Sequence, residues 1–361
     1  MGLFSKTVSY LGVDIGTSSI KIVELTQDHG RPRLVTYGFT ERRFEAVGQQ
    51  PSEAEIATAI QEICGKSRTT TTRAITSLPN FSVFSSIITL PDLNKKELAS
   101  AISWEAKKLI PTPLEDIILD WKIIGDAPLA TTANSTQATA PKRIFSKPKK
   151  NLRILLTGAS KALVNRYITI FNQAELTLLS LETENFALIR SLVGADESTQ
   201  LLVDLGASTS SITVVDHGVP VMSRSLEVGG LMITRAVSSS LNVSLDRAEQ
   251  FKQDLSLDIE TAENSLPQTV EKSFATILNE VRYTIEQYHD QNQSKIGKII
   301  LTGGGSLLGH LGGYIETKLN INTYVGDPWA RIVYPTDLKP VIDRIGPRFA
   351  VAVGLALRNL G

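Results

Sequence analysis

Two segments of this chain, 190 positions apart, repeat one pattern: an apolar strand, an aspartate, a glycine, a short polar run and a second apolar strand. The first is VDIGTSSIKIVEL, which begins at Val13, and the second is VDLGASTSSITVV, which begins at Val203. A chain that builds the same element twice over such a distance contains an internal duplication. The repeat therefore predicts two similar domains that face each other.

The polar run in each repeat has the composition of a turn that holds phosphate. Gly16 and Gly206 let the backbone approach an anion closely, because glycine has no side chain and adopts positive φ values. Hydroxyl groups provide donors for phosphate oxygens, and Lys21 adds a positive charge. The hydroxyl residues are Thr17, Ser18, Ser19, Ser208 and Thr209.

The two aspartates of the repeats, Asp14 and Asp204, would repel phosphate directly. Their presence is explained if Mg²⁺, with its water ligands, lies between carboxylate and phosphate. We therefore expect both to orient a magnesium shell, mainly through water.

A third glycine-rich element, ILTGGG from Ile300 to Gly305, lies between a buried strand and an expected helix. Three glycines permit close approach to a flat ligand, and a helix N-terminus nearby would favour an anion. The chain has no GxxxxGK[ST] sequence, so it is not a P-loop protein. The first repeat leads into a strand rather than a helix, which also excludes a dinucleotide-binding fingerprint.

These three elements, in this order, resemble the actin-like ATPase superfamily of actin, sugar kinases and heat-shock chaperones. The resemblance implies a duplicated, ribonuclease H-like α/β fold in which ATP and Mg²⁺ lie between two phosphate loops and an adenosine loop. It also implies two connecting helices that cross at a hinge, here at 185–193 and 349–359. The expected phosphate contacts are Gly16, Thr17, Ser18, Lys21, Gly206, Ala207, Ser208 and Thr209, and those bordering adenosine are Gly303, Gly304, Gly305 and Ser306.

Three further roles follow from the same resemblance. In the sequence RAEQFK, Glu249 and Lys252 are expected at the ribose and adenine edge, although two residues at this spacing also form a simple surface pair. Glu184 is a candidate for positioning the attacking water, and capping the following helix is the alternative. Because Glu184 is the one candidate for this role, we expect slow ATP hydrolysis at most.

Between the repeats, the expected order of elements is that of an inserted ferredoxin-like β-α-β-β-α-β module, with strands at 83–90, 117–124, 152–157 and 176–181. The predicted boundaries place the first core domain at 1–78 and 182–200, continuing at 345–361. The module covers 79–181 and includes a flexible loop at 126–151, which is rich in Ala, Thr and Pro and then basic. The second core domain covers 201–344.

The module and three long stretches resemble the FtsA and PilM type of actin-like protein, and most closely the PilM family of type IV pilus assembly proteins. The stretches are LFSKTVSYLGVDIGTSSIKIVEL, ITLPDLNKKELASAISWEAKKLIPTPLEDIILDWKII and LETENFALIRSL. The resemblance implies a cytoplasmic protein, associated with the inner membrane, that binds ATP and the N-terminal cytoplasmic peptide of PilN near a groove beside the module. It would link PilN to pilus motor or platform proteins. Trp104 is either an anchor for that peptide or a core residue.

Composition limits the alternatives. Lys plus Arg and Asp plus Glu both number 37, so no net charge attracts nucleic acid or an anionic membrane. Without a run of 18 apolar residues, we expect contact with the membrane only through partners.

Two other functions on the same fold are a filament-forming division protein like FtsA and a small-molecule kinase. ATP-dependent polymers would favour the former, and phosphoryl transfer to small substrates would favour the latter.

Overall fold

The computed structural model describes residues 8–41, 51–127, 150–254, 266–292 and 294–360. Two compact units make up the chain: Ser82–Asn165 form one, and the segments on either side of it form the other. Most of the loop predicted at 126–151 lies outside the described residues. The two units are described separately below.

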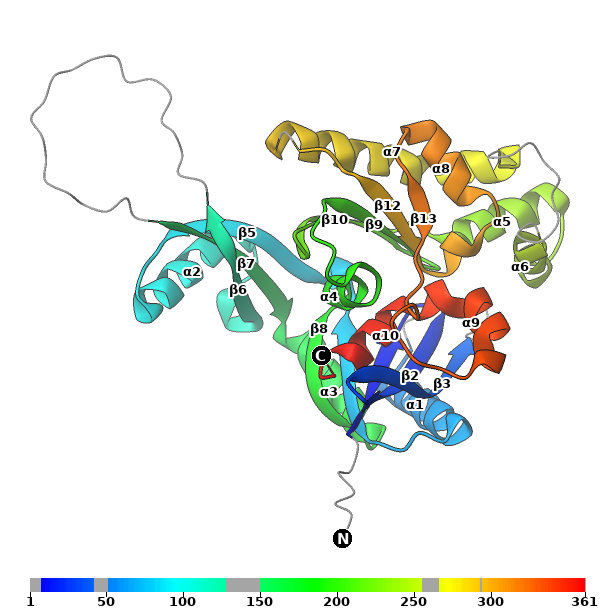
Figure 1. Cartoon of the computed structure of the whole chain (residues 1–361), viewed down its shortest axis with the longest axis horizontal. Helices are drawn as coiled ribbons and strands as arrows, with labels where there is room; N and C mark the ends of the chain where they lie inside the picture. Colours follow the sequence, from blue (N-terminus) through cyan, green and yellow to red (C-terminus); the bar gives the residue numbers. More distant parts are fainter. Residues whose placement is uncertain (1–7, 42–50, 128–149, 255–265, 293, 361) are drawn as a thin grey trace, which may run out of the picture. The chain divides into compact units, whose positions relative to one another are not determined.

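The larger unit contains two five-stranded sheets built on the same plan (Figure 1). Three consecutive strands form an antiparallel meander, and two later strands add to it in parallel. The first sheet has the order β3-β2-β1-β4-β8, and the second has the order β11-β10-β9-β12-β13. The strands are β1 (Ser9–Ile15), β2 (Ser19–Asp28), β3 (Arg31–Glu41), β4 (Arg73–Leu78), β8 (Thr177–Thr183), β9 (Gln200–Leu205), β10 (Ser210–Asp216), β11 (Val219–Leu226), β12 (Lys298–Thr302) and β13 (Thr323–Val325).

This strand-by-strand equivalence confirms the duplication predicted from the repeats and agrees with the duplicated α/β fold that the family resemblance implies. We call the part of the larger unit that carries each sheet a lobe. The equivalence extends to the turn after the repeat, which is Asp-His-Gly in both lobes, with positive φ at His29, Gly30, His217 and Gly218. Two consecutive residues with positive φ are typical of the type I′ turn that joins antiparallel strands.

Helices cover the sheets and supply most of the remaining core. In the first lobe, α1 (Glu53–Ser67) begins with a capping box, which the sequence S-x-x-E at 52–55 predicts. Ser52 and Glu55 satisfy each other's backbone N–H groups there. In the second lobe, α7 (Gln268–Asn292) carries an apolar stripe at helical spacing in its sequence and buries it, including Val270 and Phe274, against β9 and β12. The other helices are α3 (Lys161–Gln173), α5 (Gly230–Leu241), α6 (Leu245–Asp254), α8 (Leu311–Leu319) and α9 (Lys339–Ile345).

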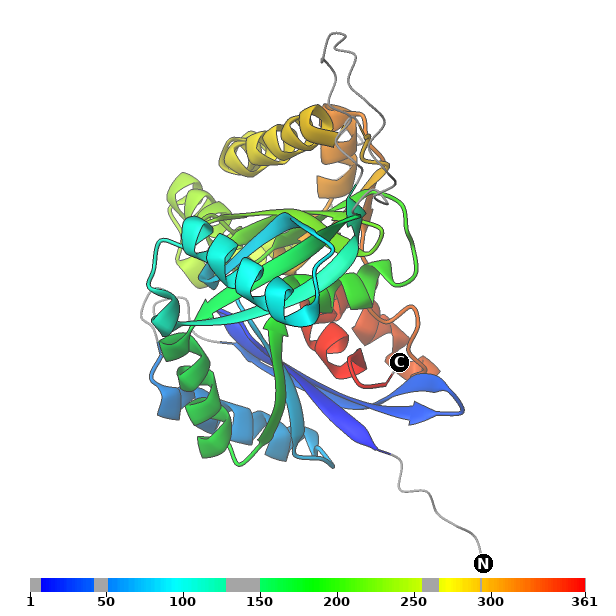
Figure 2. The same cartoon turned by 90° about the vertical axis from the view of Figure 1, so that its left-hand side faces the viewer.

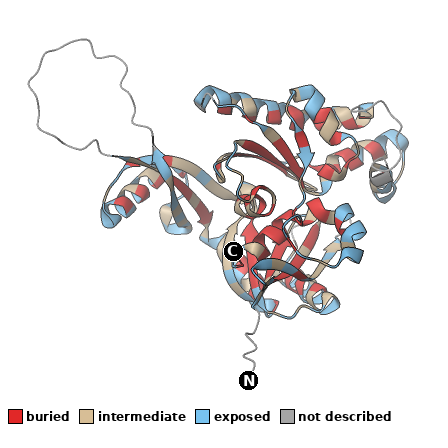
Figure 3. Cartoon of the chain, viewed as in Figure 1, coloured by how far each residue is buried: buried red, intermediate tan, exposed pale blue. Residues whose placement is uncertain are grey.

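Two helices cross at the hinge between the lobes, as the sequence predicted. They are α4 (Glu184–Leu188), which continues into a π-helical turn at Ile189–Val193, and α10 (Ala350–Leu357). Seven consecutive residues of α10, Ala350 to Ala356, are buried (Figure 3). A Cβ atom on Gly354 would lie 1.9 Å from the carbonyl oxygen of Ala187, so the two backbones touch at this point. Arg190 fastens the crossing, because it donates to the carbonyl of Gly354 at 2.6 Å and pairs with both carboxylate oxygens of Glu182.

The smaller unit is a three-stranded antiparallel sheet with one helix across it (Figure 2). Its strands are β5 (Val83–Pro91), β6 (Ile117–Ala127) and β7 (Asn151–Ser160), in the order β5-β7-β6. Helix α2 (Lys95–Leu109) packs Leu98, Ile102 and Ala106 against Ile154 and Leu156. Trp104 lies on the outer face of α2, 61% exposed, so it is not a core residue.

The strand predicted at 176–181 does not join the module. It is β8, and it pairs in parallel with β4 of the first lobe along Arg73–Leu78. The order of elements along the chain agrees with the β-α-β-β-α-β prediction, but the last strand completes the core sheet, and the compact inserted unit is therefore shorter than 79–181.

Candidate functional site

The first glycine turn joins β1 to β2 and brings Asp14 and Lys21 together. These two residues are partners in the antiparallel register, and Lys21 Nζ lies 2.9 Å from Asp14 Oδ2. The backbone N–H of Gly16 donates to the carbonyl of Ser19 at 3.0 Å, which closes the turn tightly. The predicted carboxylate, glycine and lysine therefore form one compact corner, and Asp14 is 6% exposed.

The second glycine turn joins β9 to β10 and is held by the start of α5. The carbonyls of Gly206 and Ala207 accept hydrogen bonds from the backbone N–H groups of Gly230 and Leu231, both at 2.9 Å. Asp204 lies opposite Ser211 in the register, at the position that Lys21 has in the first repeat. The second corner therefore has the aspartate without the matching lysine.

The triple glycine follows β12 and is fixed to the segment that precedes α10. The carbonyl of Pro347 accepts hydrogen bonds from Thr302 Oγ1 at 3.0 Å and from the backbone N–H of Gly303 at 3.1 Å. The predicted helix does not begin at the glycines. Residues Gly304–Leu307 form a short 3-10 turn, and α8 begins at Leu311, directly after His310, whose left-handed backbone (φ 62°) cannot be part of a right-handed helix.

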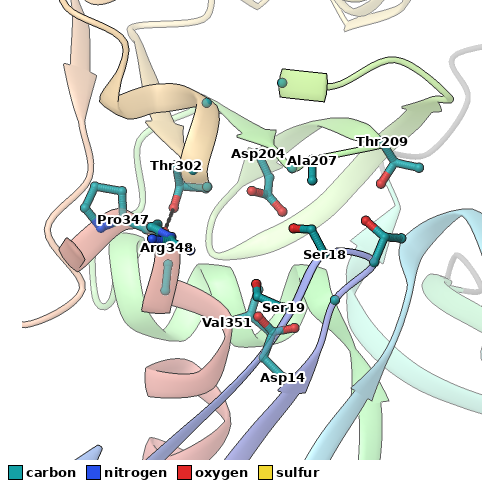
Figure 4. Close-up of a pocket in the computed structure, with 18 of the residues that line it drawn as sticks. Asp14, Ser18, Ser19, Asp204, Ala207, Thr209, Thr302, Pro347, Arg348 and Val351 are labelled. Atoms are coloured by element: carbon teal, nitrogen blue, oxygen red, sulfur yellow. Dashed lines mark hydrogen bonds between the residues drawn. The ribbon is translucent and has the colours of Figure 1, made fainter. Parts of the chain in front are cut away.

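The three elements border a single cavity of about 760 Å³ in the larger unit. The side chains that Figure 4 labels on the first two turns, including Asp14, Ser18, Asp204 and Thr209, surround a common space, with Thr302 and Pro347 at its edge. The cavity lining includes every residue predicted for the site except Ser208 and Ser306. Ser306 is buried and donates to the carbonyl of Gly303 at 2.8 Å, so it stabilises the glycine turn from behind.

Three carboxylates, those of Asp14, Glu184 and Asp204, gather at the two glycine turns. Burial raises the pKa of Asp204 to about 6, with a further contribution from Asp14 and an opposing one from Lys21. Burial also raises the pKa of Glu184 to about 8, and Asp204 adds to the effect. The nearby lysine, Lys21, is already paired with Asp14. The ionised aspartates at the turns fit a divalent cation chemically, while the rest of the lining also contains basic groups, those of Lys252, Arg344 and Arg348.

The described residues contain no group of three or more His, Cys, Asp or Glu side chains placed to hold a metal ion directly. The expectation that Asp14 and Asp204 orient a magnesium shell mainly through water stays a prediction.

Glu184 is the first residue of α4, and its carboxylate faces the cavity rather than the helix. Its Oε2 accepts a hydrogen bond from the backbone N–H of Asn80 at 3.0 Å. The residue that precedes the helix is Thr183, and no side chain caps it. Glu184 therefore lines the cavity, and its role in positioning the attacking water stays a prediction.

The raised pKa of Glu184 predicts a pH-dependent stability. An isolated glutamate has a pKa near 4.5, so folding raises the value, and the nucleotide-free protein loses stability as the pH rises from about 5 to 8. We expect Glu184→Gln to be increasingly more stable than the wild type over this range, by at most about 1.4 kcal/mol per pH unit. Thermal unfolding at pH 5, 6.5 and 8 without magnesium measures this difference. Equal slopes for the two proteins would contradict the prediction.

Glu249 and Lys252 form an ion pair at 2.6 Å, but they are not a simple surface pair. Both side chains are mostly buried and line the cavity. Thr234, on α5, donates to Glu249 Oε2 at 2.5 Å and accepts from Lys252 Nζ at 3.0 Å. Helix α6 thus presents one acidic and one basic group to the cavity, and Thr234 of α5 hydrogen-bonds to both.

Sequence reasoning missed several polar residues of the cavity lining, among them Asn80, Glu41 and Arg348. Arg348 pairs with Glu41 and lies over the ring of Phe39. The internal repeat could have revealed Asn80, because the residues after β4 occupy the place in the first lobe that the triple glycine has in the second. No sequence pattern of this kind predicts that Arg348 lies beside Glu41, because the two residues are far apart in the chain.

Comparison with known proteins agrees with this fold. The family model described as type IV pilus assembly protein PilM matches residues 12–360. A solved PilM-PilN type IV pilus biogenesis complex superposes with a TM-score of 0.79 at 24% identity, over 98% of this chain and 99% of that one. The ethanolamine utilization protein EutJ from Carboxydothermus hydrogenoformans gives a TM-score of 0.55 at 14% identity, over 97% and 89% of the two chains.

A distant sequence relative is the cell division protein FtsA of Bacillus subtilis (strain 168), 24% identical over 153 residues. That match covers 42% of this chain and 34% of FtsA. Within the described part of the chain, no helix combines the length and apolarity that crossing a bilayer requires. The family match spans nearly the whole chain, both lobes and the smaller unit included, so the chain belongs to the PilM family of actin-like type IV pilus assembly proteins.

Proposed function

We propose that this protein is an ATP-binding scaffold of the inner-membrane complex that assembles type IV pili. It holds the N-terminal cytoplasmic tail of PilN and connects PilN to motor or platform proteins of the pilus. The observation that carries the nucleotide part is the convergence of two duplicated glycine turns and the triple glycine on one cavity lined by carboxylates. A structural relative, MreB5 of Spiroplasma citri, was solved with ADP bound and has a TM-score of 0.50 with this chain.

In this proposal the phosphates lie between the two glycine turns. Gly16, Thr17, Ser18 and Lys21 contact them from one lobe, and the turn from Gly206 to Thr209 contacts them from the other. The glycines at 303–305 border adenosine, with Glu249 and Lys252 at the ribose. Asp14 and Asp204 would hold magnesium through water, and the ion would supply positive charge that offsets part of the phosphate charge.

Hydrolysis in this site is slow at most. Phosphoryl transfer depends on positioning and charge stabilisation, and it needs a group that orients the attacking water. Glu184 is our candidate for that group. With a pKa of about 8 it is largely protonated in the free protein at neutral pH, so it is poorly suited to accept a proton until the bound nucleotide and metal change its surroundings.

PilN enters the proposal through the structural relative, which was solved as a PilM-PilN complex. The nucleotide acts as a regulator in this view: by stabilising one closure of the two lobes, it changes the affinity for the peptide. Nucleotide binding and peptide binding are thus coupled without fast turnover of ATP.

Calorimetry with purified protein tests the nucleotide part. We expect Mg·ATP to bind, and Asp204→Asn to weaken binding of Mg·ATP far more than binding of ATP in the presence of a chelator, because the aspartate acts through the metal. A wild-type protein that takes up no adenine nucleotide would refute the proposal.

Titration with the synthetic N-terminal tail of PilN, in the presence and absence of saturating Mg·ATP, tests the partner. We expect binding in both conditions, with an affinity that differs between them. Equal affinities would remove the regulatory role of the nucleotide, and no binding in either condition would remove PilN as a direct partner.

A further inference from the structure

A network of polar side chains lies behind the phosphate turns of the larger unit and joins three separate elements. Asn80 follows β4 of the first lobe, Asn185 belongs to the hinge helix α4, and Ser211 lies on β10 of the second lobe. Asn80 Nδ2 donates to Asn185 Oδ1 at 2.9 Å and to Ser211 Oγ at 3.3 Å. The backbone N–H of Asn185 donates back to Asn80 Oδ1 at 3.3 Å.

The second lobe holds Asn185 with two more hydroxyl groups. Asn185 Nδ2 donates to Ser223 Oγ at 3.1 Å, and Thr213 Oγ1 donates to Asn185 Oδ1 at 2.9 Å. Thr213 and Ser223 are cross-strand partners on β10 and β11, and their hydroxyls lie 3.0 Å apart. Asn185 and Thr213 are almost completely buried. Buried polar groups that satisfy one another in this way fix a specific arrangement, because separating them leaves unpaired donors.

The hydrogen bond between Asn80 and Ser211 joins the first lobe to a strand of the second. The bonds of Asn185 to Ser223 and Thr213 also reach the second lobe, from the hinge helix that follows β8, but the Asn80–Ser211 bond is the longest of the three at 3.3 Å. A bond of this length is the one that a small rotation of the lobes about the hinge would break first. Asn80 also holds Glu184 through its backbone N–H, so the same residue contacts the carboxylate of the candidate site.

We propose that Asn80, Asn185, Ser211, Thr213 and Ser223 form an interlobe latch, in which Asn80 is a positioning residue that sets the orientation of Glu184 according to the closure of the lobes. The inference deepens the proposed function, on which its regulatory meaning rests, by naming the residues through which a bound nucleotide is sensed. Asn80 begins the 3-10 turn Asn80–Ser82, which leads directly into β5 of the smaller unit. The latch therefore lies on the covalent path from the nucleotide cavity to the inserted unit.

Single-molecule energy transfer between the lobes tests the latch. Dyes are attached at Ala54→Cys on α1 and Ser240→Cys on α5, both exposed, in a Cys64→Ser background. Without nucleotide, we expect Asn80→Ala to lower the ratio of closed to open molecules about tenfold and Ser211→Ala about threefold, since each lost hydrogen bond has a modest net effect. In the double variant, the ratio of closed to open molecules should be close to that of Asn80→Ala. It should not fall by the product of the two single effects, because both substitutions remove the same hydrogen bond.

Matched variants distinguish the loss of the latch hydrogen bonds from a nonspecific effect of substitution on the structure. Ser225 lines the same cavity and is the cross-strand partner of Ser211, so Ser225→Ala removes a neighbouring hydroxyl from outside the network and should keep the wild-type distribution. Ser211→Thr keeps the hydroxyl and should retain most of the closed population. If Asn80→Ala fails to fold, Ser211→Ala and Ser211→Thr still give the comparison.

The nucleotide-free measurement decides on the latch, and a titration with Mg·AMP-PNP decides on the proposed function. Wild-type distributions for both Asn80→Ala and Ser211→Ala in the free protein would overturn the latch, whatever the nucleotide does. The variants could instead show a lowered ratio of closed to open molecules without nucleotide, while the wild type takes up no nucleotide. That result would support the latch as a structural device and refute the proposed function.

Discussion

Gly354→Ala is expected to yield little folded protein. The added Cβ would lie 1.9 Å from the carbonyl oxygen of Ala187 and 2.5 Å from its carbonyl carbon. Both partners are main-chain atoms of buried helices, so neither can move aside as a flexible side chain would. Overpacking a core with one methyl group usually costs about 1–3 kcal/mol, and a backbone clash at the hinge should exceed about 4 kcal/mol. Soluble yield and urea unfolding measure the effect.

A second glycine of a helix provides the control. Gly65 lies in α1, and a Cβ there would meet no atom within 4 Å. Gly65→Ala should therefore leave stability unchanged or raise it by about 0.5–1 kcal/mol, because alanine favours the helix. A Gly354→Ala protein as stable as Gly65→Ala would show that the connecting helices do not cross in backbone contact.

Gly303→Ala is expected to weaken nucleotide binding about 100-fold. The backbone of Gly303, with φ 79° and ψ 174°, lies in a region that is almost exclusive to glycine. A Cβ would also lie 2.4 Å from Asp204 Oδ1 and 2.5 Å from the carbonyl oxygen of Leu205. Backbone strain and the clash together are of the order of 3 kcal/mol, which corresponds to roughly 100-fold in affinity when the turn must keep its shape to bind.

Calorimetric titration with Mg·ATP measures this loss, and Gly312→Ala is the matched control. Gly312 is in α8 of the same lobe, where a Cβ would make an ordinary contact at 3.8 Å with the carbonyl of Thr323. This variant should bind ATP as the wild type does. Wild-type affinity in Gly303→Ala would mean that the triple glycine does not border the nucleotide.

Local chemistry determines the parts of the fold that could be predicted from the sequence. The meander from 8 to 39, the capping box at Ser52 and Glu55, and the stripe of α7 depend on residues close together in the chain. The duplication added a second source of information, because two copies of one strand-turn-strand element implied two equivalent sheets. The two aspartates and the first two glycine turns followed from this repeat, the triple glycine was evident from its own sequence, and all of them lie around one cavity.

The parts that could not be predicted depend on partners distant in sequence. The strand β8 has the length and composition of a module strand, and only its register with β4 assigns it to the core. Asn80 is one polar residue after a proline, and its role appears only when α4 and β10 are placed beside it. The ion pair between Glu41 and Arg348 joins residues 307 positions apart, a separation at which sequence patterns carry no information.

The parallel pairing of β4 with β8 bears on how this architecture arose. Strand β4, helix α3 and strand β8 make an ordinary crossover unit, equivalent to β12, α8 and β13 in the other half, and the extra unit interrupts only the connection between β4 and α3. The ends of the interruption lie side by side, since Val83 pairs with Ala159. An ancestral chain could therefore have acquired the whole segment in a single genetic insertion, and a descendant could exchange it for another, with every strand of the older core still paired as before.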